Sequence, residues 1–194
     1  WWQQEDLPEE VLRARVVLIF KKGDREDLSN YRPISLLNNI YKILMAMIRI
    51  RIEEKLGVHL QKTQYGFRKA KGTADAIHYI RRMVDKGESR QSKTLLVLLD
   101  WEKALDKVWH DKLMGALERM GIPSKIRNIL SKCYSKPEFF VDSEGRQPTW
   151  KKQTTGIRQG CPLSLYLFVV FMAVLVHDIH TNDQLHMKRQ RIEG

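Results

Sequence analysis

The chain has 194 residues, of which 43% are apolar and 29% charged, so it has the length and composition of one globular domain and not of a disordered segment. Its two cysteines lie in no metal-binding spacing, which argues against a disulfide scaffold and against a structural zinc site. The formal net charge is +11. Such a balance suits a polyanionic partner such as nucleic acid, and it equally suits a merely basic surface.

Two further features concern the membrane and the chain ends. The apolar run 163–176 is shorter than the roughly 20 residues that a bilayer crossing needs, and we interpret it as a buried helix. No signal peptide opens the chain, whose first residue is Trp1. We therefore expect no membrane span, and we expect a processed product, an excised fragment or the ordered part of a longer protein.

The first elements in chain order are a strand and a helix. The β-branched and aromatic run 16–20 predicts the strand, which a turn at 21–24 and an extended or irregular segment at 30–35 follow. Apolar residues at helical spacing predict a helix over 39–57, which a glycine ends. We expect its buried stripe to consist of Ile40, Leu44, Met47, Ile48 and Ile52.

A glycine-punctuated basic loop at 64–72 leads to the next elements. Thr73 is expected to cap a second helix, whose apolar positions are Ile77, Ile80 and Val84. The polar stretch 87–92 is the best candidate for a seam between two lobes. The uninterrupted apolar run 94–99 then predicts a strand buried on both faces, and it ends at Asp100.

The second half predicts three helices and a hairpin. Two helices are marked by apolar stripes, one with Leu113, Leu117 and Met120 and the other with Ile126, Ile129, Leu130 and Cys133. Residues 138–153 indicate a β-hairpin, 156–160 a loop, and 163–179 the last strong helix. The tail 181–194 has no clear period. The whole pattern is that of an α+β fold.

Three groups of residues could carry chemistry, and each has a plain alternative. Asp100 at a strand end could bind a hard cation such as Mg²⁺, or it could simply cap a helix. The glycines of the loop 156–160 could bring backbone and Gln159 close to a ligand, or they could only shape a turn before a helix. Lysines and arginines mixed with aromatic residues could bind nucleic acid, or they could form a solvated surface; they are Lys21, Lys22, Arg32, Arg68, Lys69 and Lys71, with Tyr31, Tyr65 and Phe67.

Taken together and in order, these motifs resemble the reverse transcriptase domain of non-long-terminal-repeat (LINE-type) retrotransposons. The resemblance covers roughly 16–180, and it rests on the stretches 17–24, 30–37, 64–68, 99–108 and 156–164. It implies the fold of a right-hand polymerase, with a fingers-like region at 1–92 and a partial palm at 93–194. It also implies RNA-directed DNA synthesis, an RNA template and DNA primer as partners, two Mg²⁺ ions, and a nuclear or cytoplasmic location.

The resemblance also implies roles for single residues. Asp100 matches a catalytic, metal-binding aspartate, at which two Mg²⁺ ions would align a primer hydroxyl with the α-phosphate of the incoming nucleotide. Lys21 or Lys22 together with Arg32 would contact the triphosphate.

Leu105, Gln159 and Gly160 match positions that lie near the nucleotide, and Leu105 stands where relatives carry an aromatic ring that screens the sugar. Arg68, Lys69 and Lys71 belong to the stretch that tracks the template.

The chain departs from the family pattern in ways that keep a second hypothesis open. No Asp-Asp pair occurs, so the aromatic-Ala-Asp-Asp hairpin that supplies the remaining metal carboxylates is missing, and the sequence ends about where that hairpin would begin. Leu165 stands where proline is usual. We expect a fragment that does not polymerise by itself. The alternative is a non-catalytic, reverse-transcriptase-like module that serves as a structural or nucleic-acid-binding piece of a larger complex, with protein partners covering its truncated palm.

Overall fold

The computed structural model describes residues 1–57, 59–135, 137–142 and 149–192, and it contains six α-helices and one four-stranded sheet within them. The strand order is β2-β1-β3-β4. The strands are β1 (Ala14–Phe20), β2 (Tyr31–Leu37), β3 (Glu138–Val141) and β4 (Lys151–Lys152). The helices are α1 (Glu9–Leu12), α2 (Asn39–Leu56), α3 (Thr73–Ser89), α4 (His110–Arg119), α5 (Ser124–Ser135) and α6 (Ser164–Ile192).

The sheet joins the two halves of the chain. Strand β1 pairs antiparallel with β2 and parallel with β3, and β3 pairs antiparallel with β4. The expected strand at 16–20 and the expected hairpin are therefore present, although the hairpin's turn at 143–148 lies outside the described residues. Segment 30–35 is more regular than expected. Pro33, which has no N–H to donate, is tolerated because β2 is an edge strand.

The core forms where α2, α4, α5 and the start of α6 pack together. Its fully buried side chains include Met45, Ile48, Leu113, Leu117, Ile129, Leu130, Leu163 and Leu167. The α5 stripe is confirmed, since Ile126, Ile129, Leu130 and Cys133 are all buried. The expected α2 stripe is wrong at two positions, because Ile40 and Met47 are exposed and Tyr41 and Met45 are buried in their place.

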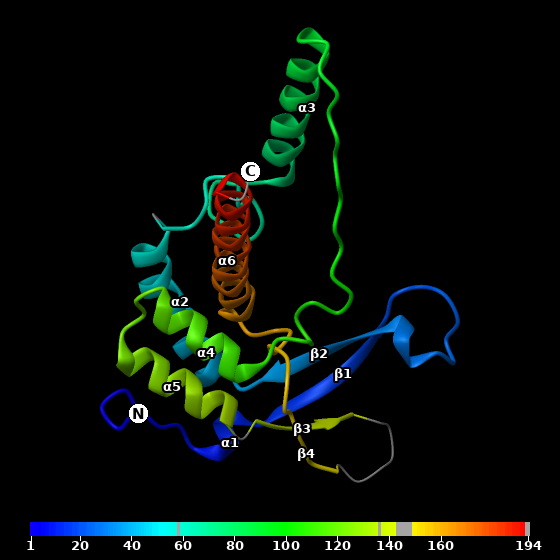
Figure 1. Ribbon diagram of the computed structural model, residues 1–194. Helices are drawn as coiled ribbons and strands as arrows, with labels where there is room; N and C mark the ends of the chain where they lie inside the picture. The colour runs from blue at the N-terminus through cyan, green and yellow to red at the C-terminus, as the bar shows by residue number, and fades with distance from the viewer. Residues whose placement is uncertain (58, 136, 143–148, 193–194) are drawn as a thin grey trace.

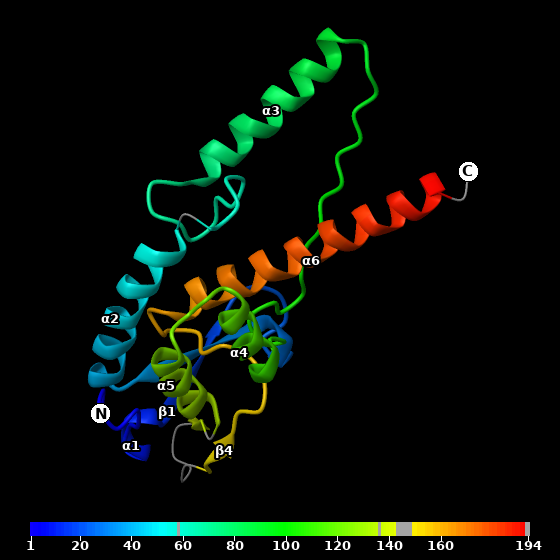
Figure 2. The same ribbon diagram turned by 60° about the vertical axis from the view of Figure 1, so that its left-hand side comes forward.

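Helix α3 stands away from this core, and the segment that follows it runs from the far end of the helix back toward the core (Figures 1 and 2). The helix begins at Thr73, as expected, but Thr73 is not its cap. Gly72 is the N-cap residue, and the carboxylate of Asp75 accepts a hydrogen bond from its N–H at 2.8 Å.

Helix α6 is longer than the sequence predicts, since it continues through the tail to Ile192. Over 164–181 it is long and apolar enough to cross a bilayer, with a mean hydropathy of 1.6, a property that a core helix shares. Leu163, just before α6, and Leu167 and Val170 in its first turns are buried, so the start of the helix belongs to the core. Only 28% of the stretch 164–181 is buried.

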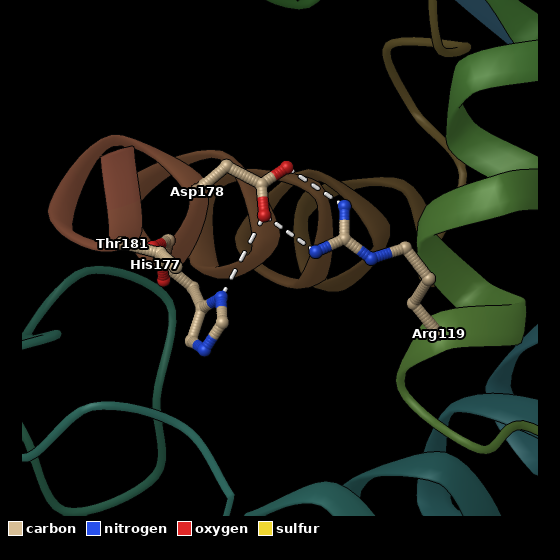
Figure 3. Close-up of polar contacts among 4 residues, drawn as sticks. All are labelled: Arg119, His177, Asp178 and Thr181. Atoms are coloured by element: carbon tan, nitrogen blue, oxygen red, sulfur yellow. Dashed lines mark hydrogen bonds and ion pairs between the residues drawn. The ribbon is translucent and has the colours of Figure 1, made fainter. Parts of the chain in front are cut away.

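An ion pair ties the middle of α6 to the end of α4. Arg119 donates to both carboxylate oxygens of Asp178, one of them at 2.7 Å (Figure 3). The Nδ1 atom of His177 lies 3.6 Å from the same carboxylate. The hydrogen bonds from Arg119, aided by His177, lower the pKa of Asp178 from 3.8 to about 2. Arg119 in turn has a raised pKa because it is hydrogen-bonded to Asp178.

Candidate nucleotide and template site

The loop 156–160 is wedged between two other segments of the chain. Gly156 and Gly160 have φ angles of +87° and +114°. A Cβ atom on Gly156 would lie 2.8 Å from the carbonyl oxygen of Asp106, and one on Gly160 would lie 2.5 Å from that of Ser35. Only glycine fits such positions without strain or displacement. The two glycines therefore do bring backbone close, and the close partner is the protein's own backbone.

Backbone hydrogen bonds fix this arrangement on both sides. The N–H of Gly156 donates to the carbonyl of Val108, and the N–H of Ile157 to that of Leu105, each at 2.8 Å. On the other side, the N–H of Ser35 in β2 donates to the carbonyl of Gln159 at 2.7 Å. Leu105, Gln159 and Gly160, three of the residues expected near a nucleotide, thus meet in one place.

The side chain of Gln159 has a partner that the sequence did not point to. Its amide Nε2 donates to Oδ1 of Asp106 at 2.9 Å in a half-buried contact. A carboxylate only accepts, so Asp106 fixes which end of the amide faces it and leaves the amide oxygen free to point elsewhere. The 53 residues between the two positions give no local signal for the pair. The nearest sequence clue was Gly156, whose close approach is to Asp106 itself.

Arg158, beside Gln159, is buried with only 2% of its surface exposed. Its guanidinium lies 5.4 Å from the ring centre of Tyr41 in α2, and its two terminal nitrogens have no hydrogen-bond partner in the described part of the chain. Burying a cation is costly, and a ring face offsets part of that cost. Arg158 therefore couples the loop 156–160 to α2. Cys133 is buried as well, and its burial raises the pKa of its thiol to about 12, so the thiol stays protonated at neutral pH.

The basic residues at the first strands gather at one end of the β1–β2 pair. Lys21 and Lys22 directly follow β1, and the N–H of Lys21 donates to the carbonyl of Asn30 at 2.8 Å. Arg32 lies on β2 opposite Ile19, and all three cations are exposed. Arg32 and Ser35 are three residues apart on one strand, about 10 Å. The cationic end of the hairpin and the loop 156–160 therefore lie along the same strand.

Asp100 does not lie at the end of a buried strand. Residues 94–100 form no regular element, and the side chains from Leu95 to Leu99 are between 54% and 87% exposed. The expected strand is wrong, because a strand is held by hydrogen bonds to its neighbours and this segment pairs with none of the four described strands. Asp100 is itself exposed, and its carboxylate makes no hydrogen bond or ion pair with any described residue.

The described residues do not fit a two-metal site. Three or more His, Cys, Asp or Glu side chains able to hold a metal ion come together nowhere in the described ranges. Asp100 alone could offer one carboxylate, and Mg²⁺ needs several oxygen ligands.

The three basic residues of the loop 64–72 differ in what they do. Arg68 donates to the backbone carbonyls of Gly57 at 2.8 Å and Gln61 at 2.9 Å, so it holds the loop in shape. Lys71 donates to the carbonyl of Lys62 at 3.1 Å and lies 5.0 Å from the ring centre of Tyr65. Lys69 is exposed and lines a hollow with Glu53 and Glu54.

Comparison with known proteins shows the family to which this chain belongs. Residues 19–188 match the family described as reverse transcriptase (RNA-dependent DNA polymerase). The chain belongs to the reverse transcriptase family. Its relatives are of the LINE type, without long terminal repeats, and the family uses divalent metal ions and binds a nucleic-acid template and primer.

Among the relatives is a Xenopus laevis protein from transposon TX1, 29% identical over 86% of this chain and 13% of its own length. The Pol polyprotein of the retrotransposable element R2 from Popillia japonica is 30% identical over 79% of this chain and 22% of its own. The jockey polymerase of Drosophila funebris is 28% identical over 82% and 18%. The chain thus spans about a fifth or less of these relatives.

A solved structure supports the fold. Apo telomerase from Candida tropicalis, truncated from its C-terminal domain, superposes with a TM-score of 0.58 at 16% identity. The alignment covers 89% of this chain and 40% of that one. The α+β reverse transcriptase fold predicted from the motifs is therefore confirmed.

Proposed function

We propose that this chain is the nucleotide- and template-binding part of an RNA-directed DNA polymerase of a retrotransposon, with fingers at 1–92 and part of the palm at 93–194. The observation that supports it most is the loop 156–160, seated between the Leu105–Asp106 segment and β2 within the stretch that matches the family. In this proposal Gln159, Gly160 and Leu105 line the nucleotide's place. The exposed cations Lys21, Lys22 and Arg32 at the end of the β1–β2 pair offset the charge of its triphosphate.

The template and metal parts of the proposal use the remaining residues. Lys69 and Lys71 contact the template backbone, and Arg68 shapes their loop and has donors to spare. Asp100 would offer one carboxylate to Mg²⁺, and the described residues bring no further carboxylates to it. When bound, Mg²⁺ supplies charge stabilisation at the transferring phosphate.

Primer extension on RNA tests the proposal. A longer chain that carries these residues together with an aromatic-Ala-Asp-Asp segment should extend a DNA primer in Mg²⁺, and Asp100→Ala should abolish the extension. Asp111→Ala is the matched control, because Asp111 is also an exposed aspartate and lies outside the loop 156–160 and the stretches that carry the family motifs. Full activity of the Asp100 variant, or equal loss in both variants, would contradict the metal role. Incorporation by the 194-residue chain alone would contradict the division of the site.

A second function is favoured by one observation. The exposed apolar residues 95–99 form a surface that a partner could cover, as expected of a non-catalytic module in a larger complex. This candidate predicts a stable complex with a second protein and no extension by any longer form. A monomer that stays monomeric at high concentration would contradict it.

A further inference from the structure

Arg158 is the only charged residue that is buried among the described residues. Its two terminal nitrogens donate to no group in that part of the chain, and its guanidinium instead lies over the ring of Tyr41. Buried charges in proteins are normally paired or hydrogen-bonded. Arg158 therefore calls for an explanation other than an ion pair.

The groups around the guanidinium supply no negative charge. Its charge acts on the phenols of Tyr41 and Tyr134 and on the thiol of Cys133, and burial raises the pKa of all three, so each is neutral at neutral pH. A buried cation among neutral groups destabilises a fold relative to an apolar side chain of similar volume, and a ring face offsets only part of that cost. Stability alone thus does not account for an arginine at this position.

The place of Arg158 in the loop 156–160 indicates what it does. It directly precedes Gln159, and different segments hold the two side chains: Arg158 packs on Tyr41 of α2, whereas Gln159 donates to Asp106 at 2.9 Å. The carbonyl of Gln159 accepts from the N–H of Ser35 at 2.7 Å. A side chain fixed in the core at position 158 restricts the backbone of the next residue, and hence where the Gln159 amide can reach.

The shape of the guanidinium explains why arginine does this better than an apolar residue. A planar, rigid group stacked on a ring has one preferred orientation. A methionine of similar length would fill the same space in several conformations, because its side chain is flexible. Arginine consequently gives the loop one arrangement at a cost in stability.

We propose that Arg158 is a positioning residue for Gln159: its buried guanidinium, stacked on Tyr41, holds the loop so that the Gln159 amide stays on Asp106 and its free oxygen faces the nucleotide's place. The role of Gln159 at a nucleotide rests on the proposed function. The positioning itself concerns contacts within this chain and can be tested without any polymerase activity.

Nuclear magnetic resonance of the 194-residue chain with ¹⁵N-labelled glutamine side chains observes the Gln159 amide directly. Gln159→Ala assigns its resonance by removing it, and Asp106→Ala shows where the resonance lies once the hydrogen bond is lost. In Arg158→Met the resonance should move at least halfway to that position. The midpoint of urea denaturation should stay the same or rise, because methionine removes an unpaired buried charge. Arg158→Lys keeps the charge without the planar group and should move the resonance equally.

Arg127→Met is the matched control. Arg127 in α5 is also an arginine of low exposure, with 27% of its side chain accessible, but it is paired. It donates to a carboxylate oxygen of Glu118 at 2.7 Å and to the carbonyl of Ile122 at 3.1 Å. Its replacement should lower the urea midpoint, because partnered groups lose their hydrogen bonds, and should leave the Gln159 resonance unchanged.

Primer extension by the longer chain supplies a second measurement. Arg158→Met should raise the KM for the incoming nucleotide about tenfold, the effect of about one lost hydrogen bond, and should change kcat by much less. A residue that only stabilised the fold would reduce the amount of active enzyme and leave KM as it is.

Two results would overturn the inference. One is an unchanged Gln159 resonance in Arg158→Met. The other is an Arg158→Met chain that is unfolded or has its urea midpoint lowered as much as Arg127→Met, which would make Arg158 an ordinary stabilising residue. A moved resonance with an unchanged nucleotide KM would support the positioning and contradict the nucleotide role of Gln159. If the longer chain extends no primer, the proposed function fails and the resonance still decides the inference.

Discussion

The position of Gly160 allows the arrangement of the candidate site to be tested by one methyl group. Replacing Gly160 by Ala puts a Cβ atom 2.5 Å from the carbonyl oxygen of Ser35 at a φ of +114°. The backbone strain costs about 1–3 kcal/mol. Moving the loop away from β2 also breaks the 2.7 Å hydrogen bond from Ser35 to Gln159, which contributes about 1 kcal/mol. We therefore expect Gly160→Ala to lower the free energy of unfolding by about 2–4 kcal/mol.

Urea denaturation followed by circular dichroism measures this change, and the chain offers a control with the same chemistry. Gly115 lies inside α4, and a Cβ atom added there would meet nothing within 4 Å. Gly115→Ala should therefore stabilise the protein by about 0.5–1 kcal/mol, because alanine favours a helix. Opposite signs in the two variants are the expected result. Ordinary surface substitutions change the free energy of unfolding by up to about 0.5 kcal/mol. A change no larger than that in Gly160→Ala would refute the close contact between the loop and β2.

Three further predictions concern other contacts. Asp178 has a pKa of about 2 in the folded protein against an ordinary 3.8, so its contribution to stability is present above about pH 4 and is lost as the pH falls toward 2. Asp178→Asn should flatten the pH dependence of the free energy of unfolding between about pH 4 and pH 2. An unchanged dependence would refute the ion pair with Arg119. Gln159→Glu places a second negative charge beside the Asp106 carboxylate and should lower the free energy of unfolding by about 1–3 kcal/mol. In a double-mutant cycle, Asp106→Asn should restore part of that loss. Additive effects would mean that the two side chains do not interact. Leu98→Lys should change the free energy of unfolding by less than about 0.5 kcal/mol, because Leu98 is 80% exposed. Leu117→Ala in the core should lower it by about 2–5 kcal/mol. Similar losses in the two variants would mean that Leu98 is buried, as in the strand expected over 94–99.

The parts of the fold that the sequence predicts are those governed by local chemistry. Helix α2 ends at the predicted glycine, Gly57, and α5 buries each predicted position, because both follow from spacing along one helix. The α2 stripe was displaced because α2 is apolar on almost every side, so that Ile40, Ile43 and Met47 compete with the buried set and only packing decides between them. The tail was missed because its polar residues give no periodic signal, although their backbone continues α6.

The site was predicted in its residues more than in its contacts. The structure brings the segments of Leu105, Gln159 and Gly160 together, and their role at a nucleotide stays a prediction. The motifs gave no sign of the Asp106–Gln159 hydrogen bond or of the buried Arg158. Contacts between segments 50 or more residues apart depend on tertiary packing. The run 94–99 has the composition of a buried strand, yet its side chains are exposed. Composition shows only which structure a segment favours. A strand also needs hydrogen bonds from neighbouring strands, and none of the described strands pairs with this segment.

The most direct test of the polymerase account is to isolate the natural protein that contains these residues, determine its chain mass, and assay it for RNA-templated nucleotide incorporation. The account predicts one chain well above 22.9 kDa that extends a primer on RNA in Mg²⁺. A chain near 22.9 kDa, held in a stoichiometric complex and unable to extend a primer, would contradict it and would favour the non-catalytic module.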